Sequence, residues 1–367
     1  MTRREILKTF GASGENLKTL LEYNQNKFDH SPYRKMIKVP LKDELFVRAW
    51  QNYYDESKSK GAFLALKEKI AQFNFPIKEH ISKDKNYLKA VRKGDFKLSD
   101  SLNLYDIELT LEHTPAGSIP IIIAKKREDF ETIIRAIGYK NEPVSLPSSM
   151  GAMTFSGYNN WDRIKTLKKE FESKNRLKGK RDEEFENILD KPQLYKDTFI
   201  VLSGNEYSSL SNRAIGLDKS SWIDISIEIR KYHEITHYFT HRFFKNMKNN
   251  IIDEIFCDYM GIVGAIDEFK SEWLLKFLGL EGEDYRKGAR LENYVPKSFS
   301  KENFEILCKL TRLAILNIAK FHKQNYKNNK YQMLFTLSYF TLEELAAEDS
   351  PKLLNLKLKE VISKWSE

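Results

Sequence analysis

Two neighbouring stretches decide how this chain is interpreted, RKYHEITHYFTHRFF at residues 230–244 and NNIIDEIFCDYMGIVGAI at residues 249–266. The first contains three of the seven histidines of the chain within nine residues. His233 and His237 are four positions apart, so on a helix they share one face, where both imidazoles can reach one metal ion. Glu234 points about 100° around the helix from the first of them, beside the open position of such an ion. The stretch predicts a metal-binding helix with a glutamate that acts as general base toward water.

The second stretch predicts a helix that supplies a third ligand. Asn250 is a favoured N-cap residue, and an apolar stripe follows it through Ile255 and Ile262. Glu254 and Asp258 lie on that stripe. Two carboxylates among aliphatic neighbours are costly to bury unless a cation or a donor compensates them. A metal ion and a histidine N–H would compensate both.

Together the two stretches resemble the gluzincin metallopeptidases, the thermolysin-like group, in which HEXXH is followed by a helix that bears EXXXD. The resemblance covers residues 233–258. It implies one Zn²⁺ ion, a peptide or protein substrate, and a zincin-like fold. The residue roles that it implies are zinc ligation by His233, His237 and Glu254, general base catalysis by Glu234, and orientation of a ligand histidine by Asp258.

The connection between the two stretches is somewhat shorter than the resemblance leads us to expect. For Glu254 to return to the metal, the first helix should end near Phe244. KNMKNN at residues 245–250 is then left to reverse the chain.

Three further residues near the motif have side chains that can bind metal, but each has a better explanation. Asp253 falls in the first turn of the second helix, where a capping role suits it. His241 lies about 12 Å along the helix axis from the first ligand, so it is interpreted as a pocket-edge or core histidine. Cys257 has better oxygen ligands beside it, and together with Cys308 it is interpreted as a buried, reduced thiol. With only two cysteines in the chain, a disulfide framework is excluded.

Arg290 and Tyr294, in GARLENYV at residues 288–295, are the candidates for stabilising an oxyanion. Their four-residue spacing can place both side chains on one side of a helical turn. The alternative is a solvent-facing arginine and a core tyrosine.

Three segments favour β-strands. Residues 105–112 alternate apolar and polar side chains, as in a half-buried strand, and residues 119–124 form an apolar run after a turn. Residues 198–203 are rich in β-branched side chains. The polar residues 204–212 that follow could offer a sheet edge to an extended peptide.

The chain is therefore predicted to be α+β, with a boundary near Pro192. Residues 1–192 are a mixed α/β region that could bind substrate. Residues 193–367 are a zincin-like catalytic region with a small sheet, the two metal-binding helices and a helical C-terminal part. Helices are expected there over residues 302–321 and 331–347. Residues 142–163 are predicted to be a long loop, either anchored on the surface by Trp161 or in contact with substrate.

The composition narrows the possible partners. The 367 residues are 41% hydrophobic and 13% aromatic, which suits a folded enzyme of two lobes. A net charge of +9 favours anionic partners, but no nucleic-acid recognition motif occurs, so a basic nucleic-acid-binding protein is the weaker alternative. No secretory signal and no apolar run of about 20 residues is found, so we expect a cytoplasmic protein that does not span a membrane.

These observations predict a zinc-dependent hydrolase, with a metallopeptidase as the first expectation. A hydrolase of a non-peptide amide and a degenerate zincin that only binds a partner are the alternatives that keep the metal. A purely structural zinc is less favoured, because it prefers four protein ligands and cysteine, whereas this set offers three ligands and leaves a position for water.

Overall fold

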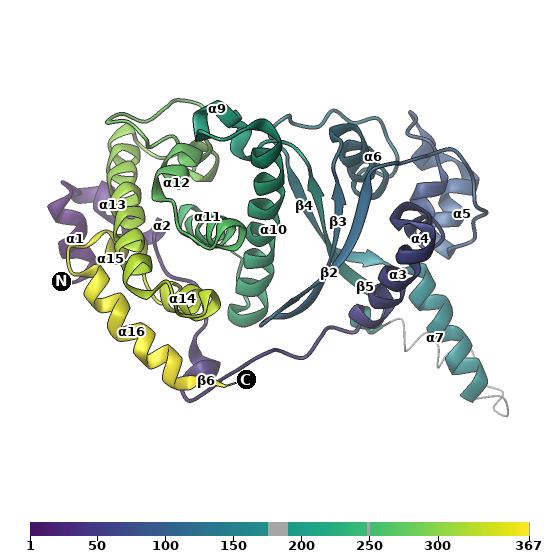
Figure 1. The fold of residues 1–367 in the computed structure, drawn as a ribbon, viewed down its shortest axis with the longest axis horizontal. Helices are drawn as coiled ribbons and strands as arrows, with labels where there is room; N and C mark the ends of the chain where they lie inside the picture. Colours follow the sequence, from purple (N-terminus) through teal and green to yellow (C-terminus); the bar gives the residue numbers. More distant parts are fainter. Residues whose placement is uncertain (175–189, 248–249, 367) are drawn as a thin grey trace. The chain divides into compact units, whose positions relative to one another are not determined.

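The computed structural model describes residues 1–174, 190–247 and 250–366 and confirms an α+β fold (Figure 1). The chain forms two compact units. We call Lys42–Asn205 the sheet unit, and Met1–Leu41 together with Glu206–Glu367 the helical unit.

The sheet unit is built on a four-stranded sheet in the order β2-β3-β5-β4. Strands β3 and β5 are parallel, and the two outer pairs are antiparallel. Every residue of β3 is buried, because this apolar strand lies inside the sheet. The strands are β2 (Ile107–Thr114), β3 (Gly117–Ala124), β4 (Ala152–Asn159) and β5 (Lys196–Ser203). The helices are α3 (Val47–Lys60), α4 (Ala62–Lys67), α5 (Lys85–Lys93), α6 (Arg127–Gly138) and α7 (Trp161–Lys174), with 3₁₀ turns at Ala71–Asn74, Ile81–Lys83 and Pro192–Leu194.

The three predicted strands are confirmed as β2, β3 and β5, and the first two form an antiparallel hairpin. The long loop predicted at residues 142–163 is wrong in part, because β4 and the start of α7 lie within it. Residues of β4 pair with β5, and the local sequence of β4 does not predict this pairing. Trp161 is an anchor, since its Nε1 donates to the Val91 carbonyl at 2.7 Å.

The helical unit contains the two predicted metal-binding helices, α10 (Lys219–Phe244) and α11 (Ile251–Ile266). Its other helices are α1 (Arg3–Thr9), α2 (Gly14–Tyr23), α9 (Asn212–Ile215), α12 (Ser271–Leu278), α13 (Lys301–Asn325), α14 (Lys330–Leu337), α15 (Leu342–Ala346) and α16 (Ser350–Lys364). The 3₁₀ turns are η1 (Ser31–Tyr33), η5 (Tyr207–Ser209) and η6 (Arg290–Tyr294). Two short strands, β1 (Ile37–Lys38) and β6 (Trp365–Ser366), pair in parallel near the two ends of the chain.

The two units differ from the division that we predicted at residue 192. Strand β5 follows that residue, but it pairs with β3 and β4 and so belongs to the sheet unit. The first 41 residues belong instead to the helical unit. The polar residues 204–212 do not form a sheet edge, because they contain η5 and the start of α9.

The chain reversal after α10 is as predicted. Helix α10 ends at Phe244, and Lys245 follows in the left-handed region with φ 55°. Asn250 caps α11, its side chain accepting from the Asp253 backbone N–H at 3.3 Å. The predicted helix over 302–321 is confirmed as α13. The single helix predicted over 331–347 is instead α14 and α15, because Thr341 starts a new helix with a capping box.

Two glycines allow α10 and α11 to pack closely. A Cβ added at Gly261 would lie 2.8 Å from the Ile229 carbonyl oxygen, and one at Gly264 would lie 2.2 Å from the Tyr232 ring. Because both contacts are shorter than real Cβ contacts, a larger residue would push the two helices apart. The glycines therefore help to set the distance between the histidines of one helix and the carboxylates of the other.

Replacing Gly261 by alanine is expected to lower the free energy of unfolding of the helical unit by about 1–3 kcal/mol, because the backbone carbonyl cannot move aside cheaply. Urea denaturation followed by tryptophan fluorescence measures this change. Gly138→Ala in α6 is the control, since its Cβ would meet only the side chains of Phe155 and Met153, at ordinary distances of 3.4 and 3.7 Å. Equal effects of the two substitutions would contradict the packing argument.

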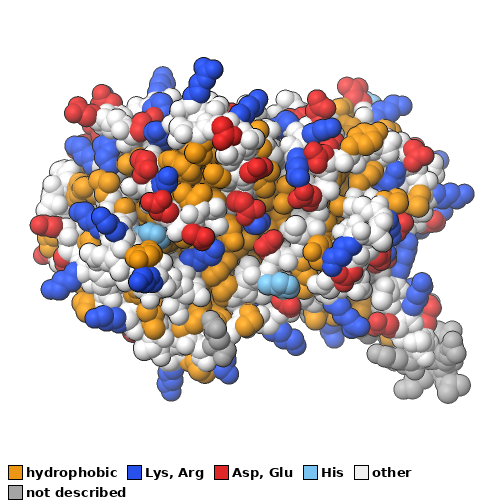
Figure 2. Space-filling view, in the orientation of Figure 1, with side chains coloured by type: hydrophobic (Ala, Val, Ile, Leu, Met, Phe, Trp, Pro, Cys, Tyr) orange, Lys and Arg blue, Asp and Glu red, His pale blue; other side chains and the backbone are white. Residues whose placement is uncertain are grey.

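The surface carries charges of both signs. On the face shown in Figure 2, lysine and arginine side chains are interspersed with aspartate and glutamate rather than gathered into one basic patch. Among the described helices, none combines the length and the apolar character that crossing a membrane requires.

Candidate metal centre

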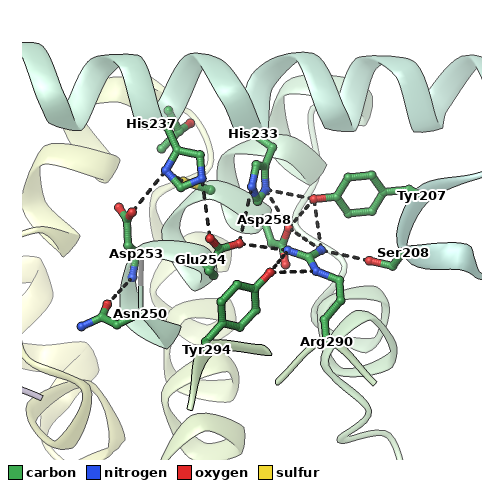
Figure 3. A network of polar contacts seen from close by, with 12 residues as sticks. Tyr207, Ser208, His233, His237, Asn250, Asp253, Glu254, Asp258, Arg290 and Tyr294 are labelled. Atoms are coloured by element: carbon green, nitrogen blue, oxygen red, sulfur yellow. Dashed lines mark hydrogen bonds and ion pairs between the residues drawn. The ribbon is translucent and has the colours of Figure 1, made fainter. Parts of the chain in front are cut away.

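Helices α10 and α11 bring the three predicted ligands together. His233 Nε2 lies 3.5 Å from Glu254 Oε2, and His237 Nε2 lies 3.7 Å from Glu254 Oε1. Figure 3 shows both imidazoles projecting from α10 toward this carboxylate. Two atoms that bind one tetrahedral zinc at about 2.1 Å lie about 3.4 Å apart. Each of the two distances is close to that value, and the two imidazoles face different oxygens of Glu254.

The other ring nitrogen of each histidine faces an aspartate of α11. His233 Nδ1 lies 2.9 Å from Asp258 Oδ1, and His237 Nδ1 lies 3.2 Å from Asp253 Oδ2. Such carboxylates fix the ring orientation of a metal ligand and leave Nε2 for the metal. Asp258 is therefore placed where the resemblance implies. The capping role expected of the Asp253 side chain is wrong, because its carboxylate faces His237 while only its backbone N–H meets the cap.

The buried carboxylates of this cluster lack some of the hydrogen-bond donors that would offset the cost of burying their charge. Asp253 and Asp258 are fully buried, and Glu254 is 4% exposed. Among the described residues, neither oxygen of Asp253 and only one of Asp258 has an aligned hydrogen-bond donor. Burial alone would lower the pKa of His237, but Asp253, Glu234 and Glu254 outweigh it and raise that pKa to about 9. The cluster thus favours positive charge at the place where the predicted metal would sit.

Cys257 offers a second set of donors. One ligand atom each of His233, His237 and Cys257 lie within 4.8 Å of one another. The thiol sulfur is 3.4 Å from His237 Nδ1, whereas Glu254 faces Nε2 of the same ring. Burial also raises the pKa of the Cys257 thiol well above its usual value, which disfavours the thiolate that a metal requires. We therefore favour the set with Glu254.

Arg290 and Tyr294, the two residues predicted to stabilise an oxyanion, are both at this cluster. The Arg290 guanidinium donates to Glu254 Oε2 at 3.1 Å and to Asp258 Oδ1 at 3.2 Å. Its Nε and Nη2 also donate to the Tyr294 hydroxyl, at 3.1 and 2.9 Å. The two side chains meet as predicted, but η6 is a 3₁₀ turn, in which residues three apart share a side, so the hydrogen bonds and not the four-residue spacing bring them together. The alternative of a solvent-facing arginine does not describe them.

Tyr207 and Ser208 belong to the same network but were not found from the sequence. The Tyr207 hydroxyl donates to Asp258 Oδ1 at 2.6 Å and lies 2.9 Å from His233 Nδ1. Ser208 Oγ accepts from Arg290 at 2.9 Å, and its backbone has a positive φ of 52° (Figure 3). A strained conformation of this kind is held by its surroundings and is common at functional sites. The contacts join η5 to α11 across about 50 residues, and no local pattern signals them.

Two more predicted residues lie on α10. Glu234 is half-buried, and its charge contributes to the raised pKa of His237, as expected of a group near the two ligands. His241 is exposed in the last turn, so of the two interpretations the core histidine is wrong. A histidine there suits the negative end of the helix dipole.

Comparison with known proteins gives a family of unknown function and no relative of known activity. Neither the curated proteins nor the solved structures contain a chain with detectable similarity to this one. One sequence profile, however, matches residues 5–349, which is nearly the whole chain. Because the match covers α10, α11 and most of both units, the chain belongs to the family of unknown function DUF7005.

Proposed function

We propose that this protein is a zinc-dependent hydrolase that cleaves peptide bonds, with the pair α10 and α11 as the centre of a zincin-like lobe. The observation that carries the proposal is the position of Glu254, whose two oxygens face Nε2 of His233 and of His237. These three residues would hold one zinc ion. Three protein ligands leave a position for water, as in catalytic zinc sites, whereas structural zinc sites are closed by a fourth protein ligand.

When bound, zinc supplies Lewis acidity that activates water and polarises a carbonyl group. Glu234 accepts the proton of the attacking water and delivers it to the leaving amine. Glu234 follows His233 directly in the helix, and its negative charge helps to raise the pKa of His237. Both observations support this role.

Tyr294 is proposed to donate a hydrogen bond to the oxyanion that forms. Its hydroxyl oxygen accepts two hydrogen bonds from Arg290, so its own proton is directed away from the guanidinium. Burial raises the pKa of Tyr294, and the hydroxyl therefore keeps this proton. Arg290, which also contacts Glu254 and Asp258, holds Tyr294 and the ligand carboxylate in place.

Tyr294→Phe is expected to lower kcat about a hundredfold to a thousandfold while KM and zinc affinity change little, because the lost hydrogen bond is made in the transition state. Steady-state kinetics with a cleaved peptide and a zinc titration measure the three quantities. Tyr326→Phe, at an exposed tyrosine of the same unit, is the control. A rise in KM at constant kcat would assign Tyr294 to substrate binding instead.

The test of the function combines metal content with cleavage. We expect one zinc per purified chain and cleavage of members of a mixed quenched-fluorescent peptide library. Removal of zinc with phenanthroline should abolish cleavage, and added zinc should restore it. A chain that takes up no zinc overturns the proposal. If the chain binds zinc but cleaves no peptide, the protein is instead a hydrolase of a non-peptide amide or a zinc protein that only binds a partner.

A further inference from the structure

Tyr23, at the end of α2 in the N-terminal segment, connects two parts of the metal centre. Its hydroxyl donates to the Tyr294 carbonyl oxygen at 3.1 Å and accepts from the Ile251 backbone N–H at 3.2 Å. Ile251 is the first residue of α11, and Tyr294 ends η6. One side chain therefore joins the start of the helix that carries Glu254 to the turn that carries Arg290.

The contact at Ile251 acts close to the predicted third ligand. The first N–H groups of a helix have no acceptor within the helix and need one from elsewhere. The Tyr23 hydroxyl supplies it for Ile251, and Glu254 lies only three residues further, in the same first turn. Burial and then the nearby charge of Glu254 raise the pKa of Tyr23 to about 12, against the opposing effect of the Ile251 N–H. The hydroxyl is therefore neutral and can donate and accept at once.

The Tyr23 ring is also held in place. It packs against Phe299 with ring centroids 5.1 Å apart. A phenylalanine at this position would keep that packing and lose only the hydroxyl. The contribution of the two hydrogen bonds can thus be separated from that of the ring.

We propose that Tyr23 is a positioning residue of the metal centre, which fixes the first turn of α11, and with it Glu254, relative to the turn that carries Arg290 and Tyr294. This proposal rests on the proposed zinc site. It gives the N-terminal segment, which the sequence predicts to lie in a region that could bind substrate, a part in metal binding.

Tyr33 provides a matched comparison within the same segment. Its hydroxyl donates to the Phe243 carbonyl oxygen at 2.9 Å, near the end of α10. Like Tyr23, it ties the N-terminal segment to a helix of the centre through a backbone group. Among the described residues, the Tyr33 hydroxyl makes no hydrogen bond to α11 or η6, so its loss should affect stability alone.

The experiment is a double-mutant cycle on zinc affinity, measured by competition with a chromophoric chelator. The proteins are the full-length chain, Tyr23→Phe, Tyr33→Phe, Glu254→Ala, and Tyr23→Phe combined with Glu254→Ala. Removing a group that orients a metal ligand typically weakens binding 10–100-fold, and Tyr23 acts one step further away, so we expect about a tenfold weakening for Tyr23→Phe. Tyr33→Phe should stay within about twofold of the unaltered chain.

In the Glu254→Ala background, Tyr23→Phe should have no further effect, because its influence passes through Glu254. A merely structural tyrosine would lower the melting temperature without changing zinc affinity, and that result would overturn the proposal. Equal effects of Tyr23→Phe in both backgrounds would overturn it as well. If the unaltered chain binds no zinc, the proposed function fails first and this inference with it, whereas normal zinc binding by Tyr23→Phe removes the inference alone.

Discussion

Glu234→Gln is expected to retain one zinc ion and to lose about a thousandfold of its turnover, the middle of the range that a general base contributes. Glutamine has nearly the same shape as glutamate, but it cannot accept the proton of the attacking water. The zinc ligands are unchanged, so the metal should stay. Single-turnover kinetics on a cleaved peptide, together with elemental analysis of the same sample, measure both parts of this result.

Glu228→Gln is the control for this experiment. Glu228 lies on the same helix, and its 40% exposed side chain pairs with Lys231 on the surface. Its replacement should leave turnover within about twofold, because exposed ion pairs contribute little. Full activity of Glu234→Gln would remove Glu234 from the role of base. Loss of zinc from that variant would instead place it among the ligands.

Glu254→Ala is expected to weaken zinc binding more than a hundredfold, because removal of a direct ligand costs more than the 10–100-fold typical of its outer partners. His233→Ala should behave in the same way. Elemental analysis after purification should find almost no zinc in either variant, whereas a chelator titration still detects weak binding. Circular dichroism of the same samples shows whether the helices remain, since Arg290 loses a partner when Glu254 is removed.

Cys257→Ala decides between the two sets of donors. If Glu254 is the third ligand, Cys257→Ala keeps one zinc per chain, because the sulfur that it removes faces His237 Nδ1, whereas Glu254 faces Nε2. The opposite pattern, with zinc lost from Cys257→Ala and kept in Glu254→Ala, would show that the thiolate is the ligand. Either outcome leaves His233 and His237 in the site, since both sets include them.

The parts of the site that lie on two helices were predictable from the sequence because helical spacing is local. The four-residue separation of His233 from His237 places both imidazoles on one side of α10. Asn250 marks the start of α11 by its capping chemistry. Because only residues 245–250 separate the two helices, the first turn of α11, which carries Glu254, must lie beside the histidines of α10.

Contacts between distant segments were not predictable in this way. Tyr207 and Tyr23 reach the centre from η5 and α2, and nothing in their own segments distinguishes them from other tyrosines. Asp253 was misjudged because a position in a first helical turn describes the backbone and not the direction of the carboxylate. Strand β4 was missed because strand pairing with β5 decides its conformation. The N-terminal segment was assigned to the wrong unit for the same reason, since its partners lie more than 200 residues away.

X-ray absorption at the zinc edge of the purified protein tests the central claim most directly, because it reports the atoms that bind the metal without requiring a substrate. We expect a first shell of nitrogen and oxygen alone at about 2.0–2.1 Å, two of the nitrogens with the outer scattering of imidazole. This shell should lose its protein oxygen in Glu254→Ala reconstituted with zinc. A sulfur shell at about 2.3 Å, or a purified chain that holds no zinc, would contradict the claim.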